Sequence, residues 1–154
     1  MDYLEAAASS YSGRARHKWK WVTISLHGAL YGFSVLAIQG TDPDRVRKGE
    51  NLISIWDALK RCENDRFMLQ NVHSKKLSMS NEEKDAINKL CSGFRNNFEH
   101  FIPTLWSIEV SIFPVVVISV CRVIHFLAFE SGNVRLTPRQ HKRVRRALGA
   151  LRAS

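Results

Sequence analysis

Arg95 and His100 are the residues of this chain best suited to chemistry, and both lie in the segment Phe94-Arg95-Asn96-Asn97-Phe98-Glu99-His100-Phe101. A fixed arginine can hold and neutralise a phosphate, and an imidazole that titrates near neutral pH can transfer a proton. These are the groups that a metal-independent ribonuclease needs. The sequence offers no competing pair of comparable quality, so the functional interpretation begins here.

The sequence predicts that this segment ends a helix. Ser80 and Glu83 are spaced as a capping box, which predicts a helix start with Ser80 as the N-cap. Pro103 cannot continue a helix, so we expect the helix to end near Phe101. His100 would then lie near a helix C-terminus, where the helix dipole favours the protonated imidazole and suits a general acid or a phosphate clamp.

An α-helical projection separates a core stripe of this helix from a polar face. The core stripe contains Ile87, Leu90, Cys91, Phe94, Phe98 and Phe101. The face that looks away from the core contains Arg95, Asn96, Glu99 and His100. Surface helices usually carry Lys, Glu or Gln on that face, so this mixture indicates a functional surface. The alternative is a solvated helix end with an incidental histidine, because an arginine and a histidine at this spacing often occur by chance.

The hydrophobic pattern predicts an all-α chain, a four-helix bundle followed by a short basic helix. The predicted main helices are 15–39, 51–62, 80–101 and 114–131, and the basic helix lies within 133–154, opened by a capping box at Thr137 and Gln140. Residues 1–13 are predicted as an N-terminal arm, and residues 106–111 as an extended link. The length of 154 residues fits a single domain.

The first predicted helix is apolar on nearly every face from Trp21 to Ile38, so it must be buried all round. Its length approaches the roughly 20 residues that cross a bilayer. However, His27 interrupts this run, and Arg122 interrupts the second apolar run, and both are costly in lipid. We therefore expect no membrane span, and we interpret His27 as a satisfied buried histidine in preference to a substrate contact.

The three cysteines, Cys62, Cys91 and Cys121, are widely spaced and form no metal-binding or disulfide pattern. They predict buried, reduced thiols and a cytoplasmic location, with no zinc site. The chain begins Met1-Asp2-Tyr3-Leu4-Glu5, which carries acids where a signal peptide would carry positive charge, so we expect no signal peptide.

The net charge of +9 is concentrated at the C-terminal end, where residues 133–154 contain seven basic residues and no acid. This helix lacks acidic residues at the i,i+4 spacing of a salt-bridged surface helix, which favours a polyanion as partner. A solvated helix that improves solubility is the alternative. For an RNA backbone, the expected contacts are Arg139, Lys142, Arg143, Arg145 and Arg146.

Arg95-Asn96 followed by His100 resembles the Arg-polar-x3-His signature of the HEPN superfamily, small helical bundles that often act as ribonucleases in prokaryotic defence systems. Further segments resemble one plasmid and bacterial subgroup of that superfamily. They are Trp19-Lys20-Trp21, His27-Gly28-Ala29-Leu30-Tyr31-Gly32, Gln39-Gly40-Thr41-Asp42-Pro43, Trp106-Ser107-Ile108-Glu109 and Phe126-Leu127-Ala128-Phe129-Glu130-Ser131-Gly132. The resemblance covers roughly residues 15 to 132, and its motifs are specific jointly rather than singly.

The resemblance implies a homodimer in which two such helices meet across a cleft and form a composite site without metal or cofactor. Arg95 would neutralise the phosphate, Asn96 would orient the substrate, and His100 would transfer the proton as the RNA 2′-OH attacks. The products would be a 2′,3′-cyclic phosphate and a 5′-OH. Glu99 would modulate His100 or pair with Arg95 in the unbound protein.

Three functions follow from these features. The first is an RNA-cleaving endoribonuclease, a toxin or antiphage effector with an antitoxin or nucleotidyltransferase partner, whose basic helix and residues 14–20 guide the phosphate backbone. The second is a HEPN module that binds a nucleotide or a partner protein without cleavage. The third is a structural dimer or membrane-associated protein whose basic helix touches anionic lipid.

Overall fold

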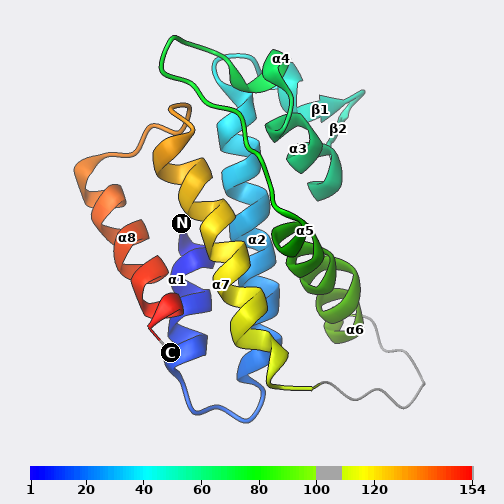
Figure 1. Ribbon diagram of the computed structural model, residues 1–154, viewed down its shortest axis with the longest axis vertical. Helices are drawn as coiled ribbons and strands as arrows, with labels where there is room; N and C mark the ends of the chain where they lie inside the picture. The colour runs from blue at the N-terminus through cyan, green and yellow to red at the C-terminus, as the bar shows by residue number, and fades with distance from the viewer. Residues whose placement is uncertain (100–108, 154) are drawn as a thin grey trace.

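The computed structural model describes residues 1–99 and 109–153 (Figure 1). Its regular structure is helical apart from one small hairpin, which confirms the predicted all-α class. The helices are α1 (Asp2–Ser12), α2 (Lys18–Gln39), α3 (Ile55–Cys62), α4 (Asp65–Met68), α5 (Asn81–Asn88), α6 (Asn96–Glu99), α7 (Ile112–His125) and α8 (Pro138–Arg152). The shorter segments are the 3-10 turn η1 (Pro43–Val46), the π-helices η2 (Lys89–Arg95) and η3 (Phe126–Glu130), and the strands β1 (Arg47–Lys48) and β2 (Asn51–Leu52).

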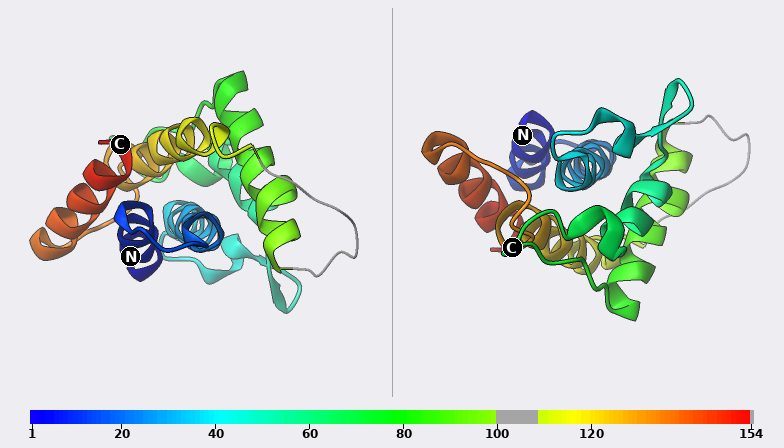
Figure 2. Two further views of the ribbon diagram at one scale, coloured as in Figure 1. Left: turned by 90° about the horizontal axis from the view of Figure 1, so that it is seen from below. Right: turned by 90° about the horizontal axis from the view of Figure 1, so that it is seen from above.

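Helices α2 and α7 form the centre of the molecule, with α1 and α8 on one side and α5 on the other (Figures 1 and 2). The hairpin, α3 and α4 lie together at one end. The largest buried side chains come from several of these elements and form one core, including Leu4, Leu30, Ile87, Phe113 and Leu151. This arrangement explains the apolar surface of α2, which contacts α1, α3, η2 and α7.

The prediction of an N-terminal arm is wrong, because residues 2–12 form α1 and pack against α2 and α8. Its buried residues, Leu4, Ala7, Ala8 and Tyr11, lie one turn apart and form a continuous stripe. Tyr3 also contacts α2, where a Cβ added at Gly28 would lie 2.9 Å from the Tyr3 ring. The small residue at position 28 therefore admits α1, whereas Gly32 has no atom within 4 Å of an added Cβ.

The second predicted helix starts later than expected. Ser54 caps α3 by accepting a hydrogen bond from the Asp57 N–H at 3.1 Å. The preceding residues, 51–52, instead form β2, which pairs antiparallel with β1. Gly49 has a φ of 64° in the connecting turn, a conformation that glycine adopts without strain.

The predicted capping box at Ser80 and Glu83 is confirmed, since the Ser80 Oγ accepts from the Glu83 N–H and the Glu83 carboxylate accepts from the Ser80 N–H. The helix is not uniform, however, because α5 passes into the π-helix η2 before α6. The predicted end at Phe101, the stop at Pro103 and the extended link from Trp106 fall mostly within 100–108, outside the described residues.

The last two predicted helices are confirmed, with Pro114 in the first turn of α7 and a capping box between Thr137 and Gln140 at the start of α8. By length and composition, Lys18–Gln39 and Ile112–Glu130 are apolar enough to cross a membrane. Just over half of the apolar stretch of each is buried inside the protein.

Candidate functional site

Arg95 and Asn96 line a pocket of about 400 Å³ between η2, α2 and the start of α3. The other lining residues are His27, Tyr31, Ile53, Ser54, Ile55, Trp56, Cys91 and Ser92. The sequence projection placed Arg95 on a face directed away from the bundle. The structure instead turns Arg95 toward α2, so the polar end of this helix lies along a groove of the same chain.

Arg95 directly follows the buried Phe94, so it lies at the flank of the core stripe, where α2 packs against η2. A π-helical turn contains more residues than an α-helical turn, so each residue of Lys89–Arg95 adds a smaller rotation than the projection assumed. The expected stripe of Ile87, Leu90, Cys91 and Phe94 remains buried, and Phe98 is partly buried against it. The residues that follow are rotated relative to the projection, and π-helical turns occur frequently at functional sites.

Arg95 and Glu99 form an ion pair in which the Arg95 Nη2 lies 2.5 Å from the Glu99 Oε2. Both side chains are about one-third exposed, at 34% and 30%. The Arg95 Nη1 also donates to the Asn96 Oδ1 at 3.4 Å, whereas the buried Arg95 Nε has no hydrogen-bond partner among the described residues. Glu99 thus partly neutralises Arg95 and fixes its orientation, which is one of the two roles expected from the sequence.

His27 on α2 faces the Arg95–Glu99 pair across this pocket. Its side chain is half-buried, and none of the residues that the structure describes hydrogen bonds to its ring. The pKa of His27 is lowered from 6.5, first by burial and second by the positive charge of Arg95, while the Glu99 carboxylate acts in the opposite direction. His27 therefore holds a neutral imidazole at pH 7, a state that can accept a proton.

Tyr31 lies one turn after His27 on α2 and ties the pocket to α3. Its hydroxyl donates to the Ile53 carbonyl at 2.6 Å, which fixes the segment that leads into α3. Trp56 in the first turn of α3 is 45% exposed at the edge of the pocket. An exposed aromatic ring beside a cation can stack an unpaired base.

The predicted site residues are thus brought together in part. Arg95, Asn96 and Glu99 are adjacent, whereas His100 lies outside the described residues. The interpretation of His27 as a satisfied buried histidine is wrong, because its ring is half-buried, has no hydrogen-bond partner among the described residues and lines this pocket. Only the packing of α2 against η2 brings His27 close to Arg95.

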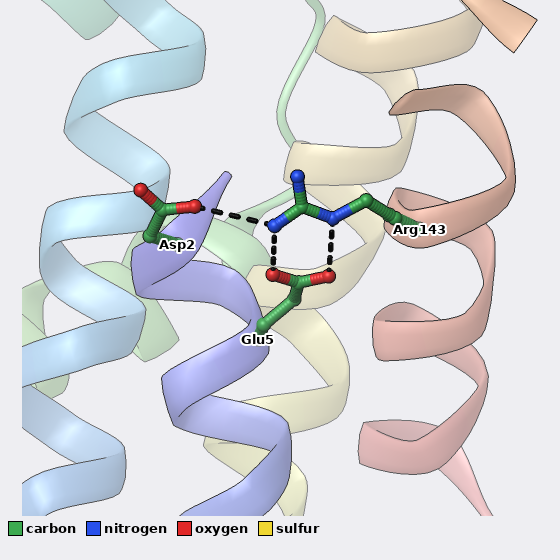
Figure 3. Close-up of polar contacts among 3 residues, drawn as sticks. All are labelled: Asp2, Glu5 and Arg143. Atoms are coloured by element: carbon green, nitrogen blue, oxygen red, sulfur yellow. Dashed lines mark hydrogen bonds and ion pairs between the residues drawn. The ribbon is translucent and has the colours of Figure 1, made fainter. Parts of the chain in front are cut away.

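The basic helix α8 is anchored to α1 through Arg143 (Figure 3). The Arg143 Nε donates to the Glu5 Oε1 at 2.7 Å, and its Nη2 contacts Glu5 and, at 3.3 Å, the Asp2 Oδ1. The acids that α8 lacks are therefore supplied by α1. The Arg143 contact lowers the pKa of Glu5, because the guanidinium stabilises the ionised carboxylate.

Arg143 is one of the five basic residues of α8 that the sequence predicts as contacts to an RNA backbone. In the structure Arg143 forms ion pairs with Asp2 and Glu5, so it links α8 to α1. The other four expected contacts are exposed: Arg139, Lys142, Arg145 and Arg146. The opposite face of α8 is buried against α1 and α7 through Val144, Ala147, Leu148 and Leu151.

All three cysteines are free and buried, as predicted. Burial raises the pKa of each thiol to about 12, so none is a reactive thiolate at neutral pH. Within residues 1–99 and 109–153, no group of three or more His, Cys, Asp or Glu side chains is placed to hold a metal ion.

Comparisons of the chain with models of known protein families, with curated proteins and with solved structures find no match. The described part of the chain is all-α, and its pocket beside α2 contains Arg95 and His27.

Proposed function

We propose that this protein is a HEPN-type endoribonuclease that cleaves RNA without a metal ion, and that two copies of its four-helix bundle form the active site. The observation that carries the proposal is the pocket in which Arg95, Asn96 and His27 meet. A cation that can bind a phosphodiester lies there beside an imidazole whose pKa is lowered.

In the proposed reaction, Arg95 binds the non-bridging phosphate oxygens and stabilises the charge that accumulates on them. An imidazole accepts the proton of the 2′-OH, the 2′ oxygen forms a bond to phosphorus, and the bond from phosphorus to the 5′ oxygen breaks. A protonated imidazole supplies the proton to the departing 5′ oxygen. The products are a 2′,3′-cyclic phosphate and a 5′-OH.

Two histidines are available for these two proton transfers. His27 is neutral at pH 7 and suits the general base, while His100, expected near a helix C-terminus, suits the general acid. Asn96 would orient the substrate, and the exposed Trp56 ring would stack a base next to the cleaved bond. Glu99 would hold Arg95 in place until a phosphate displaces it.

The remaining parts of the proposal concern the setting of this activity. The protein would act in the cytoplasm as a toxin or antiphage effector, where a reducing environment keeps its three buried thiols free. Its partners would be RNA, a second copy of the chain and an antitoxin or nucleotidyltransferase-type protein. The exposed basic residues of α8 would contact the RNA backbone.

RNA digestion in EDTA tests this proposal. The wild-type protein is expected to cleave single-stranded RNA, and His100→Ala is expected to abolish cleavage while the far-ultraviolet circular dichroism stays unchanged. His73→Ala is the matched control, since His73 is exposed and distant from this pocket. RNA or nucleotide binding without cleavage in every version would instead support the non-catalytic binding module. Vesicle association that depends on residues 133–154 would support the lipid-binding alternative.

A further inference from the structure

Three arginines, on η1, α3 and α4, gather around a single phenylalanine ring. Helices α3 and α4 lie together at one end of the molecule (Figure 1). The guanidinium carbons of Arg45, Arg61 and Arg66 lie 5.8, 4.9 and 6.0 Å from the centre of the Phe67 ring. We call these four residues the arginine cluster. They line a pocket of about 460 Å³ together with Asp42 and Asp44.

Two of these arginines are held in place by backbone carbonyls. The Arg45 Nη2 donates to the Arg66 carbonyl at 2.5 Å, and the Arg61 Nη1 donates to the Arg45 carbonyl at 2.5 Å. The Arg61 Nη2 also reaches the Arg47 carbonyl at 3.4 Å. The cluster is therefore preorganised, and a ligand that binds it loses little side-chain entropy.

No carboxylate within the described residues forms an ion pair with these three guanidinium groups. The acids on the neighbouring segments are paired elsewhere, Asp65 with Lys76 at 3.0 Å and Glu63 with Lys84 at 3.3 Å. Asp42, which does line the pocket, accepts the Asp44 N–H at 2.9 Å as the cap of η1. The three positive charges thus exceed the two negative charges of the pocket.

The β1–β2 hairpin adds further positive charge beside the cluster. Arg47 and Lys48 form β1, directly after η1, and both are exposed. Three like charges on one ring repel one another in the absence of an anion. Guanidinium groups in a fixed arrangement bind the oxygens of phosphate through paired hydrogen bonds, which makes phosphate the chemistry that this surface recognises.

We infer that the arginine cluster is a second phosphate-binding site, which takes the backbone of single-stranded RNA. The choice of RNA as the source of the phosphate rests on the proposed function. The cluster and the Arg95 pocket lie at opposite ends of α3, because Ser54 and Trp56 line the Arg95 pocket and Arg61 lies in the last turn. Eight residues of α-helix correspond to an axial length of about 12 Å, so one strand can reach both sites.

Binding of a 2′-O-methyl RNA oligonucleotide tests the inference, because an RNA without a free 2′-OH cannot be cleaved by the proposed reaction. Fluorescence anisotropy at several salt concentrations would compare the wild type with Arg66→Gln and Phe67→Leu. The Arg66 side chain is exposed and forms no hydrogen bond or ion pair with the residues that the structure describes, and leucine keeps the apolar volume of Phe67. Arg122→Gln on α7 is the matched control, since it removes an exposed arginine outside both pockets.

We expect Arg66→Gln to weaken binding by about threefold to tenfold and to reduce the slope of log K against log salt by about 1. Phe67→Leu is expected to weaken binding similarly, because the guanidinium groups lose the ring face on which they gather. The affinity of Arg122→Gln for the oligonucleotide should lie within about twofold of the wild-type value, because salt screens one distant charge. Thermal melting confirms that each variant is folded.

Binding by Arg66→Gln and Phe67→Leu equal to that of the control would overturn the inference. Uridine monophosphate, added as a competitor, distinguishes an RNA backbone from a free nucleotide. If uridine monophosphate competes only at a concentration far above that of the oligonucleotide, the site binds an RNA backbone. If it competes at an equal concentration, that assignment is overturned. Loss of binding in Arg66→Gln in a protein that cleaves no RNA would sustain the cluster and end the ribonuclease proposal. Unchanged binding by Arg66→Gln in a protein that cleaves RNA fully would overturn the arginine cluster as a binding site and sustain the ribonuclease proposal.

Discussion

The guanidinium of Arg95 and the carboxylate of Glu99 form an ion pair at 2.5 Å, and this pair faces His27 on the neighbouring helix α2. Burial is the main cause that lowers the pKa of His27, and the pair modifies this pKa in two opposing ways. Arg95 lowers the pKa of His27, whereas Glu99 raises it. Because burial adds to the effect of Arg95, the histidine is neutral under the conditions in which a general base operates.

The first prediction concerns this histidine. Arg95→Ala should raise the pKa of His27 toward its ordinary value of about 6.5, and Glu99→Gln should lower it further. Nuclear magnetic resonance titration of the His27 ring protons measures both shifts.

A lowered folded-state pKa also means that His27 contributes least to the stability of the fold at acidic pH. Its contribution is complete above the pKa of the unfolded state and is lost as the pH falls through the pKa of the folded state. A His27 pKa that is the same in all three proteins would show that the imidazole does not sense the pair.

The second prediction tests α1 as a structural helix. Leu4 is fully buried, so Leu4→Ala should lower the free energy of unfolding by about 2–5 kcal/mol. Ser9→Ala on the exposed face of the same helix should change it by less than about 0.5 kcal/mol. Urea denaturation measures both values. Equal, negligible effects would mean that residues 2–12 do not pack as α1.

The helices of this protein could be predicted where their signals are local. The capping boxes at Ser80 and Thr137 fix two helix starts, and both are found in the structure. The α1 stripe was also present in the sequence, at positions 4, 7, 8 and 11, but alanines make a weak hydrophobic signal. The later start of α3 depends on Ser54, whose capping bond begins the helix after residues 51–52 have paired in the hairpin.

The candidate site was less predictable, because its geometry depends on interactions between distant segments. The helix passes through the π-helix η2, and no residue type within Lys89–Arg95 indicates a π-helical turn by itself. The proximity of His27 and Arg95 arises from the packing of α2 against η2, between residues far apart in the sequence. Arg143 likewise finds its acids 138 residues away, at Glu5.

The third prediction concerns the contact between α1 and α8. The pKa of Glu5 is lowered by Arg143, so the pair stabilises the fold fully above the ordinary carboxylate pKa of about 4.3. The contribution is lost as the pH falls through the lowered folded-state pKa. Glu5→Gln should therefore lower the melting temperature at pH 7 and have little effect at pH 2–3. Glu50→Gln is the control, since Glu50 is exposed in the hairpin turn. A loss of melting temperature that is equal at both pH values would contradict the charge contact.

The fourth prediction compares two glycines of α2. Gly28→Ala should destabilise the fold, because the new methyl group would lie 2.9 Å from the Tyr3 ring and displace it. Gly32→Ala meets no atom within 4 Å, and alanine favours a helix over glycine by about 0.5–1 kcal/mol, so it should stabilise the monomer. Thermal melting and analytical ultracentrifugation measure the two effects. If Gly32→Ala instead dissociates a dimer, position 32 belongs to a subunit interface. That result would contradict the prediction that the added methyl group meets open space.

The most direct measurement of the central claim is the chemical identity of the ends left on a defined RNA oligonucleotide after digestion in EDTA. Mass spectrometry of the products should show 2′,3′-cyclic phosphate and 5′-OH ends with the wild-type protein, and Arg95→Ala should slow their formation by about a hundredfold or more. Intact RNA with the wild-type protein, or the same ends at the same rate with Arg95→Ala, would contradict a ribonuclease built around Arg95.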